Sequence, residues 1–167
     1  MKLNLILPTR TLKLNQKEIK IPKLGLKHHK LLKDPKAVDE SMRILVEDIH
    51  PGLDGAEAEY VIVYLAAFNG RCKEKVTKDG FTYDISTMRI VRETKFEFDK
   101  EYEFRSPYLG EVFLSAKHIL TSTHPDVDWG SMPAFVAKWA EKIASTIEID
   151  GPNGPISGCA EILKVLA

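Results

Sequence analysis

The spacing of apolar residues changes along this chain, and this change constrains the fold more than any other feature. Near the N-terminus apolar residues recur at every second position, as in Leu12/Leu14 and Ile19/Ile21, which is the spacing of a half-buried strand. Between residues 38 and 49 they recur every three or four positions, which is the spacing of one helical face. Both periods recur downstream, so the sequence predicts an α+β fold of helices packed with a small antiparallel sheet.

Two short segments carry the clearest local signals. Asp54 and Glu57 have the spacing of a capping box, and they predict a helix over the apolar run 56–68. The triplet 78–80 (Lys-Asp-Gly) separates two alternating runs and predicts a hairpin turn.

Three later helices are predicted from a serine that precedes an apolar face, at Ser106-Pro107, at Ser131 and at Ser157. The first would bury one face, made of Leu109, Val112, Phe113, Ala116, Ile119 and Leu120. The second would bury another, made of Met132, Phe135, Val136, Trp139 and Ile143. Short helices of this kind would complete the core.

Charge is balanced in total but not in position. The chain has 24 basic and 24 acidic residues, yet residues 1–36 hold ten Lys or Arg against two acids, a net +8. The remaining residues therefore carry a net charge of −8. We interpret residues 1–22 as an N-terminal basic β arm and residues 23–167 as a single α+β domain.

The basic segment is the candidate binding surface. Its lysines are spaced by three or four, and we expect them to face water or an acidic protein neighbour. The candidate partner-binding residues are Lys13, Lys17, Lys20, Lys23, Lys27 and Lys30. No aromatic residue precedes Tyr60, so the rings that stack on single-stranded bases are missing and nucleic acid is the weaker alternative.

Several classes of protein are disfavoured. The run from Tyr60 to Phe68 is about half of the ~20 residues that a membrane-spanning helix needs, so no membrane role is expected. The first ten residues lack the pattern of a signal peptide. Cys72 and Cys159 stand too far apart for a metal knuckle and are too few for a disulfide framework, so we expect reduced thiols in a cytoplasmic compartment.

No catalytic motif is present, and neither an enzyme nor a cofactor is predicted. The nearest approach to a metal site is His118, His124, Asp126 and Asp128. Imidazole and carboxylate groups could hold a hard or borderline metal there. The same residues also describe an ordinary loop between two helices, and they lack the regular spacing of a zinc or calcium site.

The order of segments resembles one family. The segments that carry this resemblance are Leu7-Pro8, Ile19–Pro22, Leu26–Leu32, the amphipathic helix expected over residues 38–49, Ala58–Leu65, the hairpin Lys73–Ile85, Phe96–Tyr108, Ile143–Asp150 and the terminal helix. In this order the chain is similar to the small baseplate hub and tail-assembly proteins of T-even-type contractile-tailed bacteriophages.

The resemblance implies a structural subunit of a phage baseplate hub or tail core, which acts through protein–protein assembly and not through catalysis. It would be made in the host cytoplasm, join other hub proteins in a symmetric oligomer, and end in the tail baseplate of the virion. A chaperone for the hub or the tape measure, absent from the virion, would show the same pattern. A nucleic-acid-binding accessory protein that uses the basic segment and a metal-dependent enzyme are two less favoured hypotheses.

Overall fold

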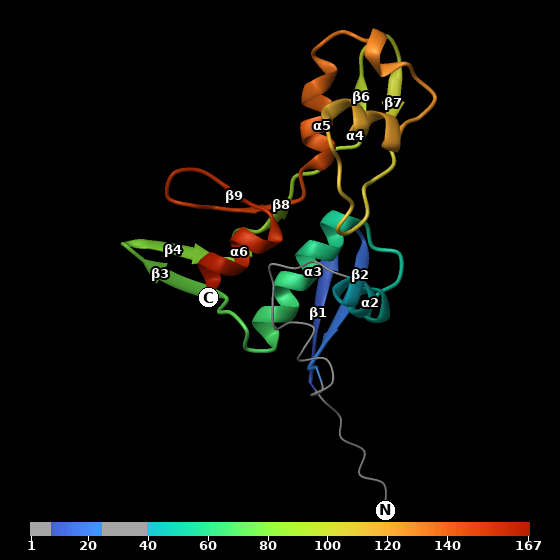
Figure 1. Ribbon diagram of the computed structural model, residues 1–167. Helices are drawn as coiled ribbons and strands as arrows, with labels where there is room; N and C mark the ends of the chain where they lie inside the picture. The colour runs from blue at the N-terminus through green and yellow to red at the C-terminus, as the bar shows by residue number, and fades with distance from the viewer. Residues whose placement is uncertain (1–7, 25–39) are drawn as a thin grey trace, which may run out of the picture.

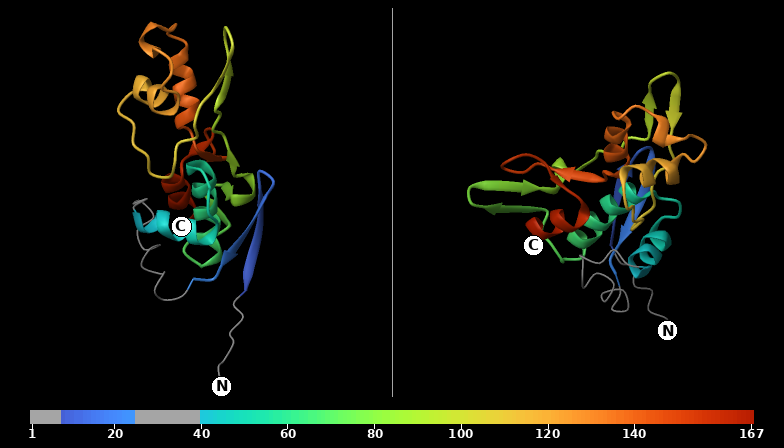
Figure 2. Two further views of the ribbon diagram at one scale, coloured as in Figure 1. Left: turned by 90° about the vertical axis from the view of Figure 1, so that its right-hand side faces the viewer. Right: turned by 45° about the horizontal axis from the view of Figure 1, so that its top comes forward.

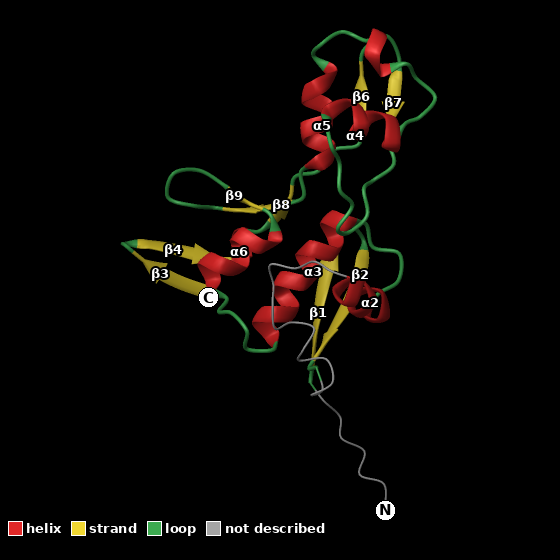
Figure 3. Cartoon of the chain, in the orientation of Figure 1, coloured by secondary structure: helices red, strands yellow, loops and turns green. Residues whose placement is uncertain are grey.

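We describe the fold from a computed structural model of the chain, which describes residues 8–24 and 40–167. These residues form helices and small antiparallel sheets, so the predicted α+β class is confirmed (Figure 3). The α-helices are α2 (Glu40–Ile49), α3 (Gly55–Phe68), α4 (Ala116–Thr123), α5 (Val136–Ala144) and α6 (Cys159–Leu166). The strands are β1 (Thr9–Leu14), β2 (Lys17–Pro22), β3 (Lys75–Lys78), β4 (Phe81–Asp84), β5 (Arg89–Ile90), β6 (Lys95–Glu97), β7 (Glu101–Glu103), β8 (Ile147–Ile149) and β9 (Ile156–Ser157).

The larger of two hydrophobic cores is built around α3. This helix contacts α2, α6, β2, β5 and β8, and it is apolar on all sides because neighbours surround it. Strands β5, β8 and β9 form one sheet, while β1–β2 and β3–β4 are separate hairpins. We call these elements together the body, which occupies the lower part of Figure 1.

The hairpin β1–β2 is part of the body's core. Its turn is Asn15-Gln16, with φ of 47° and 66°, the left-handed conformation that a two-residue hairpin turn favours. One face buries Leu12, Leu14, Ile19 and Ile21 against the helices. The β segment expected at the N-terminus is therefore present but covered on one face; the domain boundary at residue 22 stays a prediction.

The capping box at the start of α3 is confirmed. The Asp54 carboxylate accepts a hydrogen bond from the Glu57 backbone N–H at 2.9 Å, and Glu57 accepts one from the Asp54 N–H at 3.2 Å. Lys17 of β2 also donates to the buried Glu57 carboxylate at 2.9 Å. One carboxylate therefore fixes both the helix start and the hairpin that packs on it.

The smaller core lies in a separate lobe made of β6, β7, α4 and α5. Its rings pack in stacked and edge-to-face pairs, for example Phe96 on Trp139 at 5.1 Å between centroids. The buried members are Tyr102, Phe104, Leu120, Trp129, Val136, Trp139, Ala140 and Ile143. The lobe stands above the body in Figure 1, and both views of Figure 2 show it extending from the same end.

Arg92 joins the body to the lobe. Its Nε donates to the Ser145 carbonyl at 3.0 Å, its Nη1 donates to the Pro107 carbonyl at 2.8 Å, and its side chain is only 5% exposed. The Gly55 N–H of α3 donates to the same Pro107 carbonyl at 2.9 Å. Burial lowers the pKa of Arg92, while nearby Asp54 opposes that shift.

The helix predicted from Ser106-Pro107 is wrong. Residues 107–115 form a loop, and α4 begins only at Ala116, after Ser115 accepts a hydrogen bond from the His118 N–H. The Pro107 carbonyl that would start the helix accepts from Gly55 and Arg92 instead. Tertiary hydrogen bonds thus replace helical ones here.

This loop is held in place by an ion pair. Nη1 and Nη2 of Arg105 each donate a hydrogen bond to the Glu111 carboxylate at 2.9 Å. The Tyr108 N–H donates to the same carboxylate at 3.2 Å. The bonds from Arg105 lower the pKa of Glu111. The expected apolar face is formed only in part: Leu109 and Leu120 are buried, whereas Val112 is 77% exposed. The neighbouring Leu114, which was not expected on that face, is 88% exposed.

Other boundaries also differ from expectation. Ser131 ends a 3-10 turn, and α5 starts at Val136 because Pro133 lies between them. The last helix spans the predicted Cys159–Leu166, but Gly158 is its N-cap and Ser157 belongs to β9. The sequence also predicts a short helix over 24–32 and a start at Asp34-Pro35 for the helix that follows. The first lies almost wholly, and the second wholly, outside the described residues.

Substituting Gly55 by Ala should destabilise the protein. An added Cβ would lie 2.9 Å from the Pro107 carbonyl oxygen, which is backbone and cannot move aside cheaply. We expect Gly55→Ala to lower the free energy of unfolding in urea by about 1–3 kcal/mol. Gly130→Ala is the control, because its Cβ would meet only side-chain atoms at 3.4 Å or more. Equal stability of the two variants would refute this close packing.

The ion pair of Glu111 should make stability depend on acid pH. Because its folded pKa lies below the ordinary 4.5, the unfolded state binds more protons in that range, and stability rises with pH. This contribution is complete above the unfolded pKa and is lost as pH falls through the folded one. Urea titrations below about pH 5 should therefore show a shallower pH dependence for Glu111→Gln than for wild type. Glu141→Gln, on an exposed position of α5, should keep the wild-type slope.

Candidate partner-binding surface

Two of the six candidate lysines lie exposed on the solvent face of β1–β2. Alternation along the strands turns Lys13 and Lys20 to the side opposite the buried Leu12 and Ile19. Thr11 is paired with Lys20 in the strand register, and Glu18 is paired with Lys13. We call Thr11, Lys13, Glu18 and Lys20 the basic hairpin face. Neither of these lysines forms an ion pair within the described residues.

Other basic side chains of this segment bind the body itself. Lys17 is paired with Glu57, as described above. Lys23 donates to the Phe68 carbonyl, with its ammonium 4.1 Å from the Phe68 ring centroid. Arg10 pairs with Glu74 and also lies over the ring of Tyr64. These contacts attach the hairpin to α3 and to the segment that follows it.

Lys27 and Lys30 lie outside the described residues. The proposed binding role of all six lysines stays a prediction; the structure adds that Lys13 and Lys20 are exposed, whereas Lys17 and Lys23 have partners in their own chain. Strand β1 pairs only with β2 among the described strands, so its other edge offers backbone groups to a further strand.

The loop 107–115 adds apolar surface where the sequence predicts part of the core. Val112 and Leu114 are the most exposed of the large apolar side chains that the structure describes. Tyr108 is also exposed, with the Arg43 guanidinium 5.1 Å from its ring centroid. Since the Arg105–Glu111 pair holds the loop, these side chains are presented from a fixed backbone.

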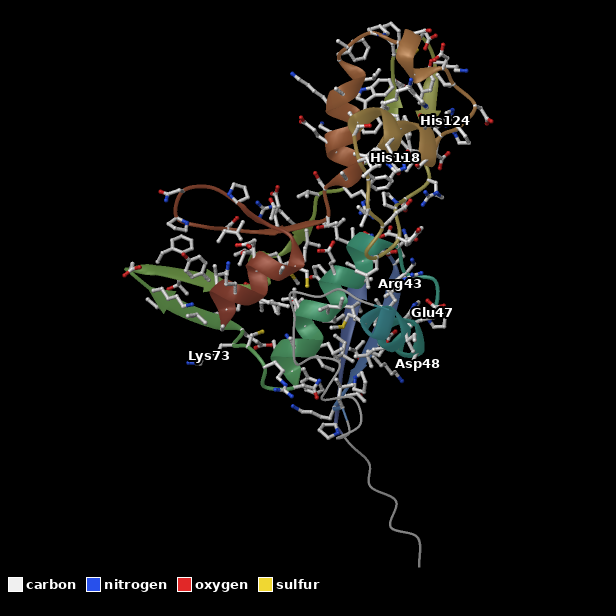
Figure 4. The ribbon with its side chains drawn as sticks, viewed as in Figure 1. Arg43, Glu47, Asp48, Lys73, His118 and His124 are labelled. Atoms are coloured by element: carbon white, nitrogen blue, oxygen red, sulfur yellow. The ribbon has the colours of Figure 1, made fainter. Side chains whose placement is uncertain are left out.

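Both histidines and Asp128 of the possible metal site have separate partners. Figure 4 places His118 and His124 apart in the lobe. His118 Nδ1 accepts from the Leu114 N–H at 2.9 Å, and His124 Nδ1 lies 3.0 Å from the Glu103 carbonyl oxygen. Asp128 accepts from the Ser131 hydroxyl at 2.6 Å. Within residues 8–24 and 40–167, no group of three or more His, Cys, Asp or Glu could hold a metal ion.

Neither cysteine has the properties of a nucleophile. Burial raises the pKa of Cys72 to about 11, and burial raises the pKa of Cys159 further. Both thiols are therefore protonated near neutral pH. Both cysteines are free, in agreement with the expectation of reduced thiols.

An open cavity of about 390 Å³ lies where the lobe meets the body. Arg92, Glu59 and Glu111 contribute charged groups to it, and the loop 107–111 forms one wall. The Glu59 carboxylate accepts from the Cys159 N–H, and the other two charged groups hold the joint and the loop. The hydrogen bonds of these three charged groups therefore stabilise the junction between the lobe and the body.

The burial of Arg92 and the exposure of the loop 107–115 were not predicted from the sequence. Arg92 stands in a mixed segment with no motif around it, so no sequence signal indicates that it is buried. For the loop a signal existed, because Gly110 interrupts the proposed helical face and adopts a φ of 77°. No helix among the described residues is long and apolar enough to cross a lipid bilayer.

Comparisons with known proteins agree with the family suggested by the order of segments. A family model described as "Baseplate hub distal subunit" matches residues 21–166. The baseplate hub assembly protein gp28 of Enterobacteria phage T4 is 39% identical over 173 aligned positions, which cover 98% of each chain. No solved structure matches the chain. The chain therefore belongs to the family of phage baseplate hub distal subunits.

Proposed function

We propose that this chain is a structural subunit of a contractile-tail baseplate hub, that it remains in the virion, and that it acts by binding other hub proteins. The observation that carries this proposal is the 39% identity to the baseplate hub assembly protein gp28, which extends over nearly the whole of both chains. An enzymatic role has no support from the described residues, since their ionisable side chains serve the fold or face solvent.

The proposed contacts use the basic hairpin face and the loop 107–115. Among the described residues Lys13 and Lys20 have no ion pair and β1 pairs only with β2, so the hairpin offers positive charge and a strand edge. Val112 and Leu114 offer apolar side chains on a backbone that is already ordered. Such a combination suits a subunit that is built into an assembly, because charge aids encounter and apolar burial stabilises the complex.

A second candidate is a chaperone that assists hub assembly and then leaves. The word "assembly" in the name of gp28 favours keeping this candidate. Both candidates predict binding to hub proteins, and they differ in whether the chain is found in finished particles. Binding to nucleic acid is less favoured, since two of the four candidate partner-binding lysines that the structure describes, Lys17 and Lys23, are used within the chain.

Mass spectrometry of purified virions tests the structural role. We expect this chain among the baseplate proteins of the particle in a fixed ratio to other hub proteins, and cryo-electron microscopy should locate it in the hub. Finding it bound to tail precursors in infected cells but absent from virions would favour the chaperone. Absence from both would refute a hub role.

Charge reversal tests the proposed surface. We expect Lys13→Glu/Lys20→Glu to reduce incorporation into particles at least about tenfold, because it replaces both exposed cations by anions. The control is Lys78→Glu/Lys138→Glu, which changes charge equally at two other exposed positions. Incorporation is measured by quantitative mass spectrometry after complementation of a phage that lacks the gene. If both double variants enter virions equally well, the basic hairpin face is not the contact.

A further inference from the structure

The β6–β7 hairpin carries an uncompensated acidic face. Phe96 and Tyr102 of this hairpin pack in the lobe's core, so alternation turns Glu97, Glu101 and Glu103 to solvent. Glu97 and Glu101 are directly opposite in the strand register. Like charges opposite one another on paired strands repel, and none of the three has an ion-pair partner within the described residues.

Two exposed rings lie at the turn of this hairpin and continue its core-facing side, since Phe135 also packs on Trp139. Phe98 is in the turn that joins β6 to β7, and it meets Phe135 edge to face at 5.0 Å between centroids. Their exposed fractions are 53% and 42%. The face of an aromatic ring attracts an ammonium group, and a carboxylate pairs with one. We call Glu97, Phe98, Glu101, Glu103 and Phe135 the acidic tip.

The acidic tip is complementary in charge to the basic hairpin face. Lys13 and Lys20 have no ion pair with any residue that the structure describes, and their aliphatic stems can lie against rings while their ammonium groups meet carboxylates. Both surfaces also carry charge of the opposite sign. Glu18 lies on the hairpin face, while Lys95 is directly opposite Glu103 in the strand register and Lys100 lies in the β6–β7 turn. The two surfaces are thus complementary in sign and in composition.

One copy of the chain does not bring its own two surfaces together. The basic hairpin face belongs to the body and the acidic tip to the lobe, each built on a different core. Figure 1 shows β1–β2 beside α3 in the lower part of the molecule and β6–β7 at the top. The complementary charges can meet only between molecules.

We propose that the basic hairpin face of one copy docks on the acidic tip of a second copy. Such a contact joins two different surfaces, so each added copy leaves one of each surface free for the next. The result is a head-to-tail series that closes into a ring or extends as a filament. This inference rests on the proposed function, because it names a second copy of the chain as one partner in the hub.

Sedimentation velocity on the purified full chain tests this contact. We expect the mean sedimentation coefficient to rise with protein concentration in about 50 mM salt, and to fall to that of a monomer in about 500 mM salt. The reason is that exposed ion pairs are screened at the higher salt concentration. A monomer at every concentration in low salt would overturn the proposal.

Charge exchange makes the test specific. Lys13→Glu/Lys20→Glu and Glu97→Lys/Glu101→Lys should each weaken self-association at least about tenfold. An equimolar mixture of the two variants should associate again, because each altered surface is then complementary to the altered surface of the other. Failure of the mixture to associate, with both variants folded by circular dichroism, would overturn the proposal.

One further variant is a control and another tests the rings. Glu141→Lys/Glu161→Lys changes charge at exposed positions away from the acidic tip and should associate like wild type. Phe98→Ala should weaken association, and it should also lower the urea midpoint slightly because the ring packs on Phe135. If the wild-type chain is monomeric yet enters virions through Lys13 and Lys20, this inference fails while the proposed function stands.

Discussion

The hydrogen bonds of Arg92 are the interaction on which the arrangement of the two cores depends. A buried guanidinium must find acceptors, since an unpaired charge in an apolar surrounding is strongly destabilising. Arg92 finds them in the carbonyls of Ser145 and Pro107, with the Asp54 carboxylate 3.9 Å away. Those groups lie at the end of α5, in the loop that leads to α4, and at the cap of α3. One side chain therefore sets where the lobe stands on the body.

The same joint explains why the loop 107–115 is not helical. Once Pro107 accepts hydrogen bonds from Gly55 and Arg92, the following residues cannot close a helical turn on it. Glu111 then pairs with Arg105, which leaves Val112 and Leu114 in solvent. An ordered loop with exposed apolar side chains is unusual for an isolated molecule and typical of a surface that a partner covers. The fold and the assembly role are thus linked through this loop.

The features predicted correctly from sequence are local ones. The capping box at Asp54 and Glu57 and the turn at Asp79-Gly80 depend on residues within a few positions of one another. The helix start expected at Ser106 was wrong because a serine and an apolar periodicity do not reveal the tertiary donors that bind the Pro107 carbonyl. The start expected at Ser131 was wrong because Ser131 ends a 3-10 turn and Pro133 precedes α5. Burial of Arg92 could not be predicted, since its partners are 15 and 53 positions away.

By itself the sequence determined the fold class, the family and the alternation that puts lysines on one face of the N-terminal hairpin. Local periodicity and the order of segments suffice for these, because they require no knowledge of which segments meet. Only the tertiary structure decided which lysines are available. Glu57 lies 40 positions from Lys17, and the Phe68 carbonyl lies 45 positions from Lys23; these contacts use two cations internally and leave Lys13 and Lys20 exposed. A charge count reports how many cations a segment has, whereas their availability depends on the groups that folding brings beside them.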